Sequence, residues 1–209
     1  VYAIAHIRGG MEKGKKWYEN GKKKNKLNSF KDFITCAEFL KKENISKNIT
    51  IHGGSAGGLL IGASLNISPD TFHCAVAEVP FVDVLNTILD DTLPLTPPEW
   101  EEWGNPIKNK SDFDYIGSYS PYDNIKEQNY PAILATSGLT DPRVTYWEAT
   151  KWIAKLRSKK TNDNPLFLKT YTEAGHGGMA GRYNQIKETA FVYAFILWRN
   201  NLIKRPFTR

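Results

Sequence analysis

The sequence contains no apolar run long enough to cross a membrane, and it has little cysteine. Its longest mostly apolar stretch is Ala190–Trp198, well short of the roughly 20 residues that a membrane-spanning helix needs. No stretch resembles a signal peptide. The two cysteines, Cys36 and Cys74, show neither a disulfide pattern nor metal-ligand spacing. We therefore expect two buried thiols in a protein of the reducing cytoplasm, with no metal, no cofactor and no membrane partner.

The sequence also lacks an initiating methionine, since it begins at Val1 within an apolar segment that predicts a strand, Val1–His6. We expect it to be part of a longer protein. Its 209 residues are enough for one hydrophobic core, so we predict a single domain over residues 1–209. Apolar residues make up 41% and charged residues 24%, which is ordinary for a globular domain.

Charge is distributed unevenly along the chain. Residues 78–127 contain eleven acids and three bases, so they carry −8 while the rest carries +14, for a total of +6. An acidic segment in a basic protein predicts a site that attracts cations. Residues 13–26 hold seven lysines without the regular aromatics of a nucleic-acid reader, so we expect a solvated loop and no nucleic-acid partner. These are Lys13, Lys15, Lys16, Lys22, Lys23, Lys24 and Lys26.

Strand-like and helix-like patterns alternate along the chain. After the first segment, the predicted strands are Ile49–His52, Cys74–Val79, Ala132–Thr136 and Leu166–Tyr171. The predicted helices are Phe30–Leu40 with Asn28 or Ser29 as cap, Leu59–Asn66, Tyr146–Leu156 and Ile186–Leu197. This order predicts an α/β fold, with a mostly parallel sheet and helices on both faces. A proline-rich acidic insertion at about residues 80–130 interrupts it and cannot be one regular element.

Residues with catalytic chemistry follow three of the predicted strands. Active sites of parallel sheets lie at the carboxyl ends of the strands. Ser55, Asp141 and His176 each occur in a loop directly after a strand, in that order. A serine hydroxyl becomes nucleophilic when an imidazole takes its proton, and a carboxylate orients and stabilises that imidazole. The sequence therefore predicts Ser55 as nucleophile, His176 as base and Asp141 as the orienting acid, with His176 in a flexible glycine-flanked loop.

Ser55 lies at the centre of a G-x-S-x-G pattern between a strand and a helix, the context of a nucleophile elbow. We expect Gly53 and Gly57 to keep this tight turn free of clashing side chains. The backbone N–H of Ala56 is expected to face the oxygen that becomes negative during acyl transfer. A phosphate-binding loop is excluded because no Lys-Ser or Lys-Thr pair follows the glycines.

The three other histidines fit the role of base less well. His6 and His52 end predicted strands and are expected to point into the core or the next loop. His73 begins a strand. We interpret all three as structural.

Six segments are distinctive in combination and span nearly the whole chain. They are Ala5-His6-Ile7-Arg8-Gly9-Gly10, Gly53-Gly54-Ser55-Ala56-Gly57-Gly58, Val79-Pro80-Phe81-Val82-Asp83, Glu101-Glu102-Trp103-Gly104-Asn105-Pro106, Ser118-Tyr119-Ser120-Pro121-Tyr122-Asp123 and Gly175-His176-Gly177-Gly178. Together they resemble the prolyl oligopeptidase family of serine peptidases, in its oligopeptidase B branch. The resemblance implies an α/β-hydrolase fold and hydrolysis of short peptides after Arg or Lys. It also implies a β-propeller that covers the catalytic domain.

The resemblance assigns further site residues by position. Glu99 and Glu101 match acids that bind the basic side chain of the substrate, and Phe81 matches a wall of that pocket. Arg143 matches the arginine that holds a carbonyl of the bound peptide. Independently, a carboxylate pair suits a guanidinium fork, and both glutamates lie in the acidic insertion.

The sequence departs from the family in what it does not contain. The propeller, the first strands of the sheet and the tyrosine that is the family's second oxyanion donor are not in it, and Met11 stands where a third glycine is usual. We expect the missing N-terminal portion, on the same or a separate chain, to be a partner. Two alternatives stay open: an inactive or complementing fragment of a split gene, and an esterase or acylaminoacyl peptidase on the same scaffold. Glu99 and Glu101 argue against the second, because an apolar pocket would suit those substrates better.

Overall fold

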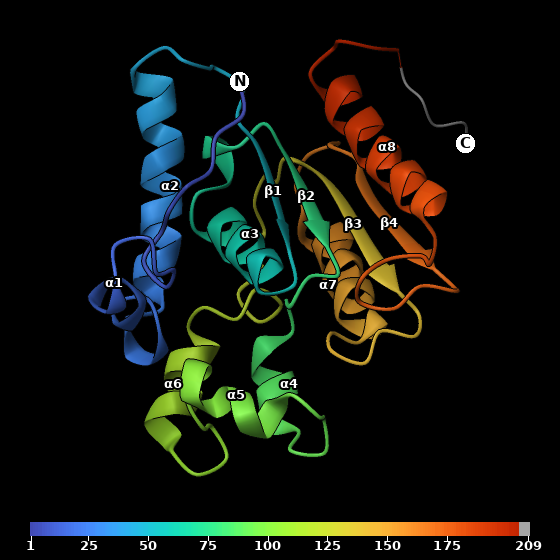
Figure 1. Ribbon diagram of the computed structural model, residues 1–209. Coiled ribbons are helices and arrows are strands. Elements are labelled where there is room, and N and C mark those ends of the chain that lie inside the picture. The colour runs from blue at the N-terminus through green and yellow to red at the C-terminus, as the bar shows by residue number, and fades with distance from the viewer. Residues whose placement is uncertain (205–209) are drawn as a thin grey trace.

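A parallel sheet forms the centre of the computed structural model, which describes residues 1–204 (Figure 1). In this described part the sheet has four strands in the order β1-β2-β3-β4, every neighbouring pair parallel. They are β1 (Thr50–Gly54), β2 (Cys74–Glu78), β3 (Ala132–Gly138) and β4 (Leu166–Tyr171). The predicted α/β fold and these strands are confirmed. Because all strands run the same way, their carboxyl ends meet at one edge.

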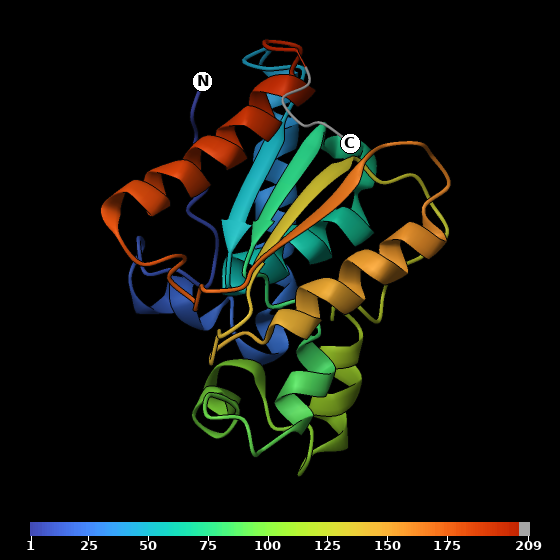
Figure 2. The same cartoon turned by 90° about the vertical axis from the view of Figure 1, so that its right-hand side faces the viewer.

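Helices cover both faces of the sheet, as predicted (Figure 2). One face packs against α2 (Leu27–Lys42), α3 (Ala56–Ile67) and α7 (Tyr146–Lys159), and the other against α8 (Arg182–Arg199). Neighbouring residues of a strand point to opposite faces. Within β3, accordingly, Ile133 belongs to the core under α7 while Leu134 belongs to the core under α8.

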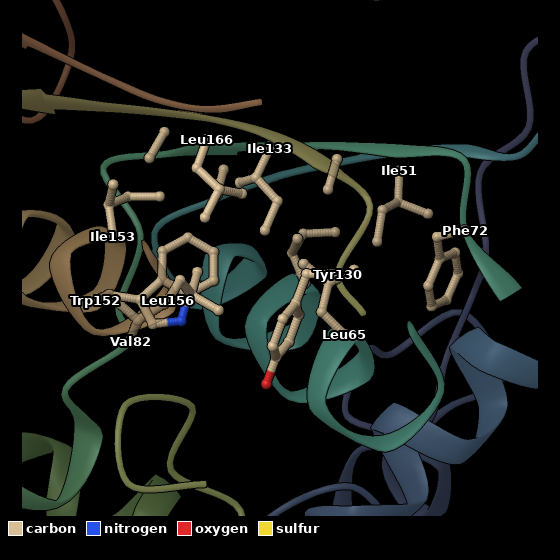
Figure 3. Packing of buried hydrophobic residues seen from close by; sticks show 14 of the residues in the cluster. Ile51, Leu65, Phe72, Val82, Tyr130, Ile133, Trp152, Ile153, Leu156 and Leu166 are labelled. Carbon is tan, nitrogen blue, oxygen red and sulfur yellow. The ribbon is translucent and has the colours of Figure 1, made fainter. Parts of the chain in front are cut away.

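The larger core lies on the face covered by three helices (Figure 3). Trp152, Ile153 and Leu156 of α7 pack with Ile133 and Leu166 of the strands. Trp152 and Ile153 are at most 1% exposed. This burial, worth roughly 25 cal/mol per Å² of apolar area, fixes α7 against the sheet and so fixes the loop that precedes α7.

The acidic insertion folds into three short helices beyond the carboxyl ends of the strands (Figure 1). They are α4 (Val84–Leu89), α5 (Thr96–Trp103) and α6 (Lys110–Gly117). Pro97 and Pro98 lie in the first turn of α5, where a missing N–H costs nothing. The Asn109 side chain caps α6 by accepting a hydrogen bond from Ser111 N. The insertion therefore stands over the edge of the sheet at which an active site is expected.

The lysine-rich segment is only partly the solvated loop that we predicted. It forms α1 (Lys15–Glu19) and the 3₁₀ turn η1 (Lys23–Asn25), and it docks on α5. Lys26 Nζ lies 2.8 Å from a carboxylate oxygen of Glu102, with the Lys26 side chain 9% exposed. Burial lowers the pKa of Lys26, and Glu102 partly offsets this effect. The basic segment thus neutralises part of the acidic insertion.

Three details of the prediction are wrong. Val1–His6 is not a strand, because its backbone pairs with none of the described strands, and Val1 and Tyr2 are largely exposed. Helix α2 begins at Leu27, before the expected caps, and Ser29 Oγ instead donates to Arg8 O. Cys74 is buried as expected, but Cys36 is exposed. No helix within residues 1–204 has both the length and the apolar character to span a bilayer.

Candidate active site

Ser55 occupies a strained turn between β1 and α3. Its φ of 54° and ψ of −123° lie outside the regions that L-residues prefer, and such strain persists only where the surroundings hold it. The Ser55 N–H donates to Glu78 O at the end of β2, at 2.9 Å. The turn presents the hydroxyl at the carboxyl edge of the sheet.

The glycines that this turn requires are not the pair that the sequence predicted. A Cβ at Gly53 would lie 2.5 Å from Gly57 O, and one at Gly58 would lie 2.4 Å from Pro80 Cα. A Cβ at Gly57 would meet nothing within 4 Å. Close approach therefore explains Gly53 and Gly58, and the expectation for Gly57 is wrong, because its Cβ would point into open space.

A chain of two hydrogen bonds joins the three candidate catalytic residues. His176 Nε2 lies 3.1 Å from Ser55 Oγ, and His176 Nδ1 lies 2.7 Å from Asp141 Oδ2. The Asp141 side chain is fully buried, and its Oδ1 accepts from the backbone N–H groups of Arg143 and Val144 at 2.8 and 3.1 Å. These two backbone donors fix the Asp141 carboxylate. It can therefore hold His176 with Nδ1 protonated and Nε2 free to accept the serine proton.

The loop that carries His176 is anchored at both ends, although the sequence predicted flexibility there. Before His176, Ala174 O accepts hydrogen bonds from Thr140 N at 3.1 Å and Thr140 Oγ1 at 2.9 Å. After it, Met179 N donates to Glu188 Oε1 of α8 at 2.9 Å. These contacts hold the imidazole between Ser55 and Asp141.

Ala56 begins α3, so its N–H is among those that no helical carbonyl can accept. It directly follows Ser55 and lies at the positive end of the helix dipole. This geometry suits a donor to the carbonyl oxygen that becomes negative when Ser55 Oγ attacks an acyl group.

A pocket opens beside Ser55, between the sheet and the helices of the insertion. Phe81 and Trp103 form part of its wall, with ring centroids 5.4 Å apart. Glu99 and Arg143 also line it. The remaining lining residues are Ala56, Thr87, Ile88, Leu93, Leu95, Thr96 and Val144.

The structure brings Glu99 to this pocket but does not bring Glu101 there. Glu99 Oε2 accepts a hydrogen bond from the Trp103 indole Nε1–H at 2.8 Å. The Glu101 side chain is 87% exposed, and its carboxylate lies 2.9 Å from Lys23 Nζ. Lys23 lowers the pKa of Glu101. Neighbours two apart on a helix face different directions, which separates the two glutamates.

The other histidines have other partners. His6 Nδ1 lies 3.5 Å from Glu12, His52 Nε2 pairs with Glu78 at 2.5 Å, and His73 Nε2 lies 2.6 Å from Arg199 O. The side chains of His6 and His52 are about half exposed, which excludes the core as their place and leaves the other expectation, that they point into the next loop. Among residues 1–204, no three His, Cys, Asp or Glu side chains cluster as metal ligands do.

Sequence reasoning missed three residues that organise this site: Trp103, Glu148 and Glu188. Glu148 and Glu188 bind backbone N–H groups outside their own helices, and no spacing rule identifies such contacts. Trp103 lies four residues after Glu99, the spacing at which side chains of one helix meet, but the sequence predicted no helix there. The Asp141–Glu148 spacing, for example, carries no motif. Only the folded arrangement shows that Glu148 reaches the segment after β2.

Comparison with known proteins gives one consistent result. A sequence model described as the prolyl oligopeptidase family matches residues 1–201. The chain is 50% identical to Protease 2 of Moraxella lacunata over 199 residues, covering 94% of the chain and 29% of that protein. It is 49% identical to dipeptidyl aminopeptidase BI of Pseudoxanthomonas mexicana, covering 94% of the chain and 27% of that protein.

Solved structures agree with these sequence matches. Oligopeptidase B from Trypanosoma brucei, with covalently bound antipain, matches with a TM-score of 0.94 at 50% identity, over 97% of this chain and 29% of that one. Oligopeptidase B from Leishmania major matches with a TM-score of 0.90 at 49% identity, over 93% of this chain and 27% of that one. The chain therefore spans less than a third of the length of these relatives, and the matched part is their catalytic α/β-hydrolase domain.

Proposed function

This chain belongs to the prolyl oligopeptidase family, and we propose that the protein containing it is a serine oligopeptidase that hydrolyses short peptides after Arg or Lys. The observation that carries the proposal is the juxtaposition of two features. The hydrogen-bonded series Ser55–His176–Asp141 suits acyl transfer, and the pocket beside Ser55 is lined by the Glu99 carboxylate.

In the proposed mechanism, Ser55 Oγ attacks the scissile carbonyl carbon while His176 Nε2 takes the hydroxyl proton. The negative oxygen of the tetrahedral intermediate accepts a hydrogen bond from the Ala56 N–H. His176 then gives the proton to the leaving amine, which departs and leaves an acyl ester on Ser55. Water, deprotonated by His176, attacks this ester and releases the acid and the free serine. Asp141 stabilises the imidazolium at each stage.

We propose that specificity for a basic side chain comes from close contact in the pocket, since this chain as a whole carries +6 and its acids are concentrated in the insertion that carries Glu99. Glu99 is half-buried in the pocket, where salt screens an ion pair less than at the surface. A guanidinium can present two donors in the plane of a carboxylate, so the pocket should prefer Arg to Lys. Arg143, which lines the same pocket, is proposed to hold a carbonyl of the bound peptide.

The relatives are more than three times as long as this chain, and the part that it does not cover suggests a partner for it. We propose that an N-terminal portion, on the same or a separate chain, covers the site and supplies the second oxyanion donor. We also propose a cytoplasmic location, on the ground that Cys36 and Cys74 are both free thiols.

Two glutamine variants of the complete protein test this function. Glu99→Gln should lower kcat/KM for Arg substrates. The loss of transition-state stabilisation should be about 2–5 kcal/mol, the usual cost of removing one partner of a desolvated ion pair. Glu101→Gln is the matched control, and its loss should stay below about 1 kcal/mol, as for a surface pair. Substrates with a neutral side chain should respond little to either change. An unchanged ratio of Arg to neutral substrates in Glu99→Gln would contradict the proposal.

A further inference from the structure

Glu148 is a buried carboxylate that none of the proposed steps uses. It lies in the first turn of α7 and is 0% exposed. Its Oε2 accepts hydrogen bonds from Val82 N and Asp83 N, both at 2.9 Å, and its Oε1 accepts from Thr87 Oγ1 at 2.8 Å. A buried carboxylate is costly unless it is fully hydrogen-bonded, and here all three donors come from one segment. Glu148 therefore ties α7 to the residues that follow β2, as the neighbouring positions of α7 and α4 show (Figure 2).

That segment builds a wall of the substrate pocket. Phe81 and Thr87 both line the pocket; Phe81 directly precedes the first residue that Glu148 holds, and Thr87 is the last. Phe81 N donates to the backbone oxygen of Ser55 at 3.0 Å, so the segment is joined directly to the candidate nucleophile. At its other end, Thr87 O accepts a hydrogen bond from Thr96 Oγ1 of α5 at 2.8 Å. A shift of this segment would move the pocket relative to Ser55.

The segment also begins with a strained residue. Val79 has a φ of 40°, which is unfavourable for a β-branched side chain and costs on the order of 1–3 kcal/mol. Such a conformation persists only when its surroundings determine it. Val79 N is held by Thr136 O at 2.8 Å and Phe81 N by Ser55 O, and Glu148 then holds Val82 N and Asp83 N.

Helix α7 also binds residues 82–87 through a second side chain, Lys151. The Asp83 carboxylate forms an ion pair with Lys151, one turn after Glu148, and accepts a hydrogen bond from Asn86 Nδ2 at 2.7 Å. Glu148 and Lys151 lie three residues apart, and therefore on one side of the helix. The same helix follows the loop of Asp141, so α7 links the candidate acid to the pocket wall.

We propose that Glu148 is a positioning residue for the substrate pocket, which sets Phe81 and Thr87 relative to Ser55 by holding residues 82–87. The inference rests on the proposed function only in taking this pocket as the place of the substrate side chain. It does not require that side chain to be basic.

Substitutions at Glu148 in the complete protein test this role. Glu148→Ala removes all three acceptor contacts and should raise KM about tenfold for both an Arg and a neutral substrate, with kcat changed less than about threefold. Glu148→Gln should restore KM to within about threefold, because its amide oxygen accepts from both N–H groups and its amide nitrogen donates to Thr87 Oγ1. Reaction of Ser55 with a small uncharged phosphonate should be nearly unchanged. Glu127→Ala is the control, since it removes an exposed carboxylate that pairs with Lys159, a residue of α7 like Glu148.

The outcomes separate this inference from the proposed function. A KM rise shared by Arg and neutral substrates supports positioning, whereas a rise for Arg alone would assign Glu148 to charge recognition and overturn it. Unchanged KM in a folded Glu148→Ala, or equal losses in the Ala and Gln variants, would also overturn it.

If Glu148→Ala does not fold, Glu148→Asp decides, because its carboxylate is one methylene too short to hold the segment. Raised KM with normal labelling of Ser55 then supports the inference, and unchanged KM or lost labelling contradicts it. Absence of any Arg preference in the parent protein counts only against the proposed function.

Discussion

Trp103 donates its indole N–H at 2.8 Å to the carboxylate of Glu99, which lies one turn earlier on the same helix. Trp103 is itself fixed from two sides. Its ring packs against Phe81 in the pocket wall, and Lys26 Nζ lies 4.6 Å from the centroid of the ring. The carboxylate proposed to recognise a basic side chain is therefore oriented before a substrate arrives, which reduces the ordering cost of binding.

Replacing Trp103 with Phe should weaken recognition of Arg. The variant keeps an aromatic ring against Phe81 but removes the donor to Glu99. Hydrogen bonds to charged groups contribute about 1.5–3 kcal/mol, so kcat/KM for Arg substrates should fall at least about tenfold. Trp100→Phe is the matched control, since it removes an indole donor of α5 that binds Ile88 O instead. Equal effects of the two variants on the ratio of Arg to neutral substrates would show that Trp103 does not orient Glu99.

The three hydrogen-bonded residues should act as one unit. If His176 serves only to activate Ser55, then Ser55→Ala with His176→Ala should be hardly slower than either single variant. Steady-state rates of peptide hydrolysis by the single and double variants show whether the losses are additive. Losses that multiply would give His176 a role separate from Ser55.

Two adjacent glycines of the elbow should differ in their effect on stability. Gly58→Ala would place a Cβ 2.4 Å from Pro80 Cα, and overpacking of this kind costs about 1–3 kcal/mol. Gly57→Ala meets open space within α3 and should stabilise the helix by about 0.5–1 kcal/mol. Denaturant unfolding of the two variants measures both changes. A loss of stability in Gly57→Ala equal to that in Gly58→Ala would contradict the close approach seen at Pro80.

Glu148 should make stability depend on pH. Burial raises its pKa from 4.5 to about 7, partly offset by its hydrogen bonds to Asp83 N, Thr87 and Val82 N. The folded protein thus binds a proton more tightly than the unfolded chain, so this contribution to stability is present below pH 4.5 and is lost as pH rises through about 7. At 1.36 kcal/mol per pKa unit, the loss is at most about 3 kcal/mol. The unfolding free energy of the parent, measured from pH 4.5 to 8, should fall relative to that of Glu148→Gln as pH rises, because the glutamine stays neutral. A constant difference would contradict the raised pKa.

The sheet and the order of the catalytic candidates could be predicted from the sequence because each depends on local pattern. Ile49–His52 and Ala132–Thr136 are apolar β-branched runs, and Ser55 and Asp141 follow them within a few residues. Once the strands are parallel, the carboxyl ends meet and bring these side chains together. Chain order and strand direction therefore suffice to predict that grouping.

Other features depended on contacts that no local pattern encodes. Val1–His6 has the composition of a strand, but a strand also needs a neighbour to pair with, and these residues pair with none of the described strands. Glu99 and Glu101 look equivalent in the sequence, yet the rotation of a helix turns one toward the pocket and the other toward Lys23. The lysine segment gave no sign that Lys26 would be buried against α5.

The identity of the nucleophile is the claim on which the whole account depends. Treating the complete protein with an organophosphonate and mapping the modified peptide tests it directly. The account predicts a single adduct on Ser55, loss of labelling in Ser55→Ala, and slow labelling in His176→Ala, because the hydroxyl then lacks its base. Labelling that persists in Ser55→Ala, or an adduct on another serine, would contradict it.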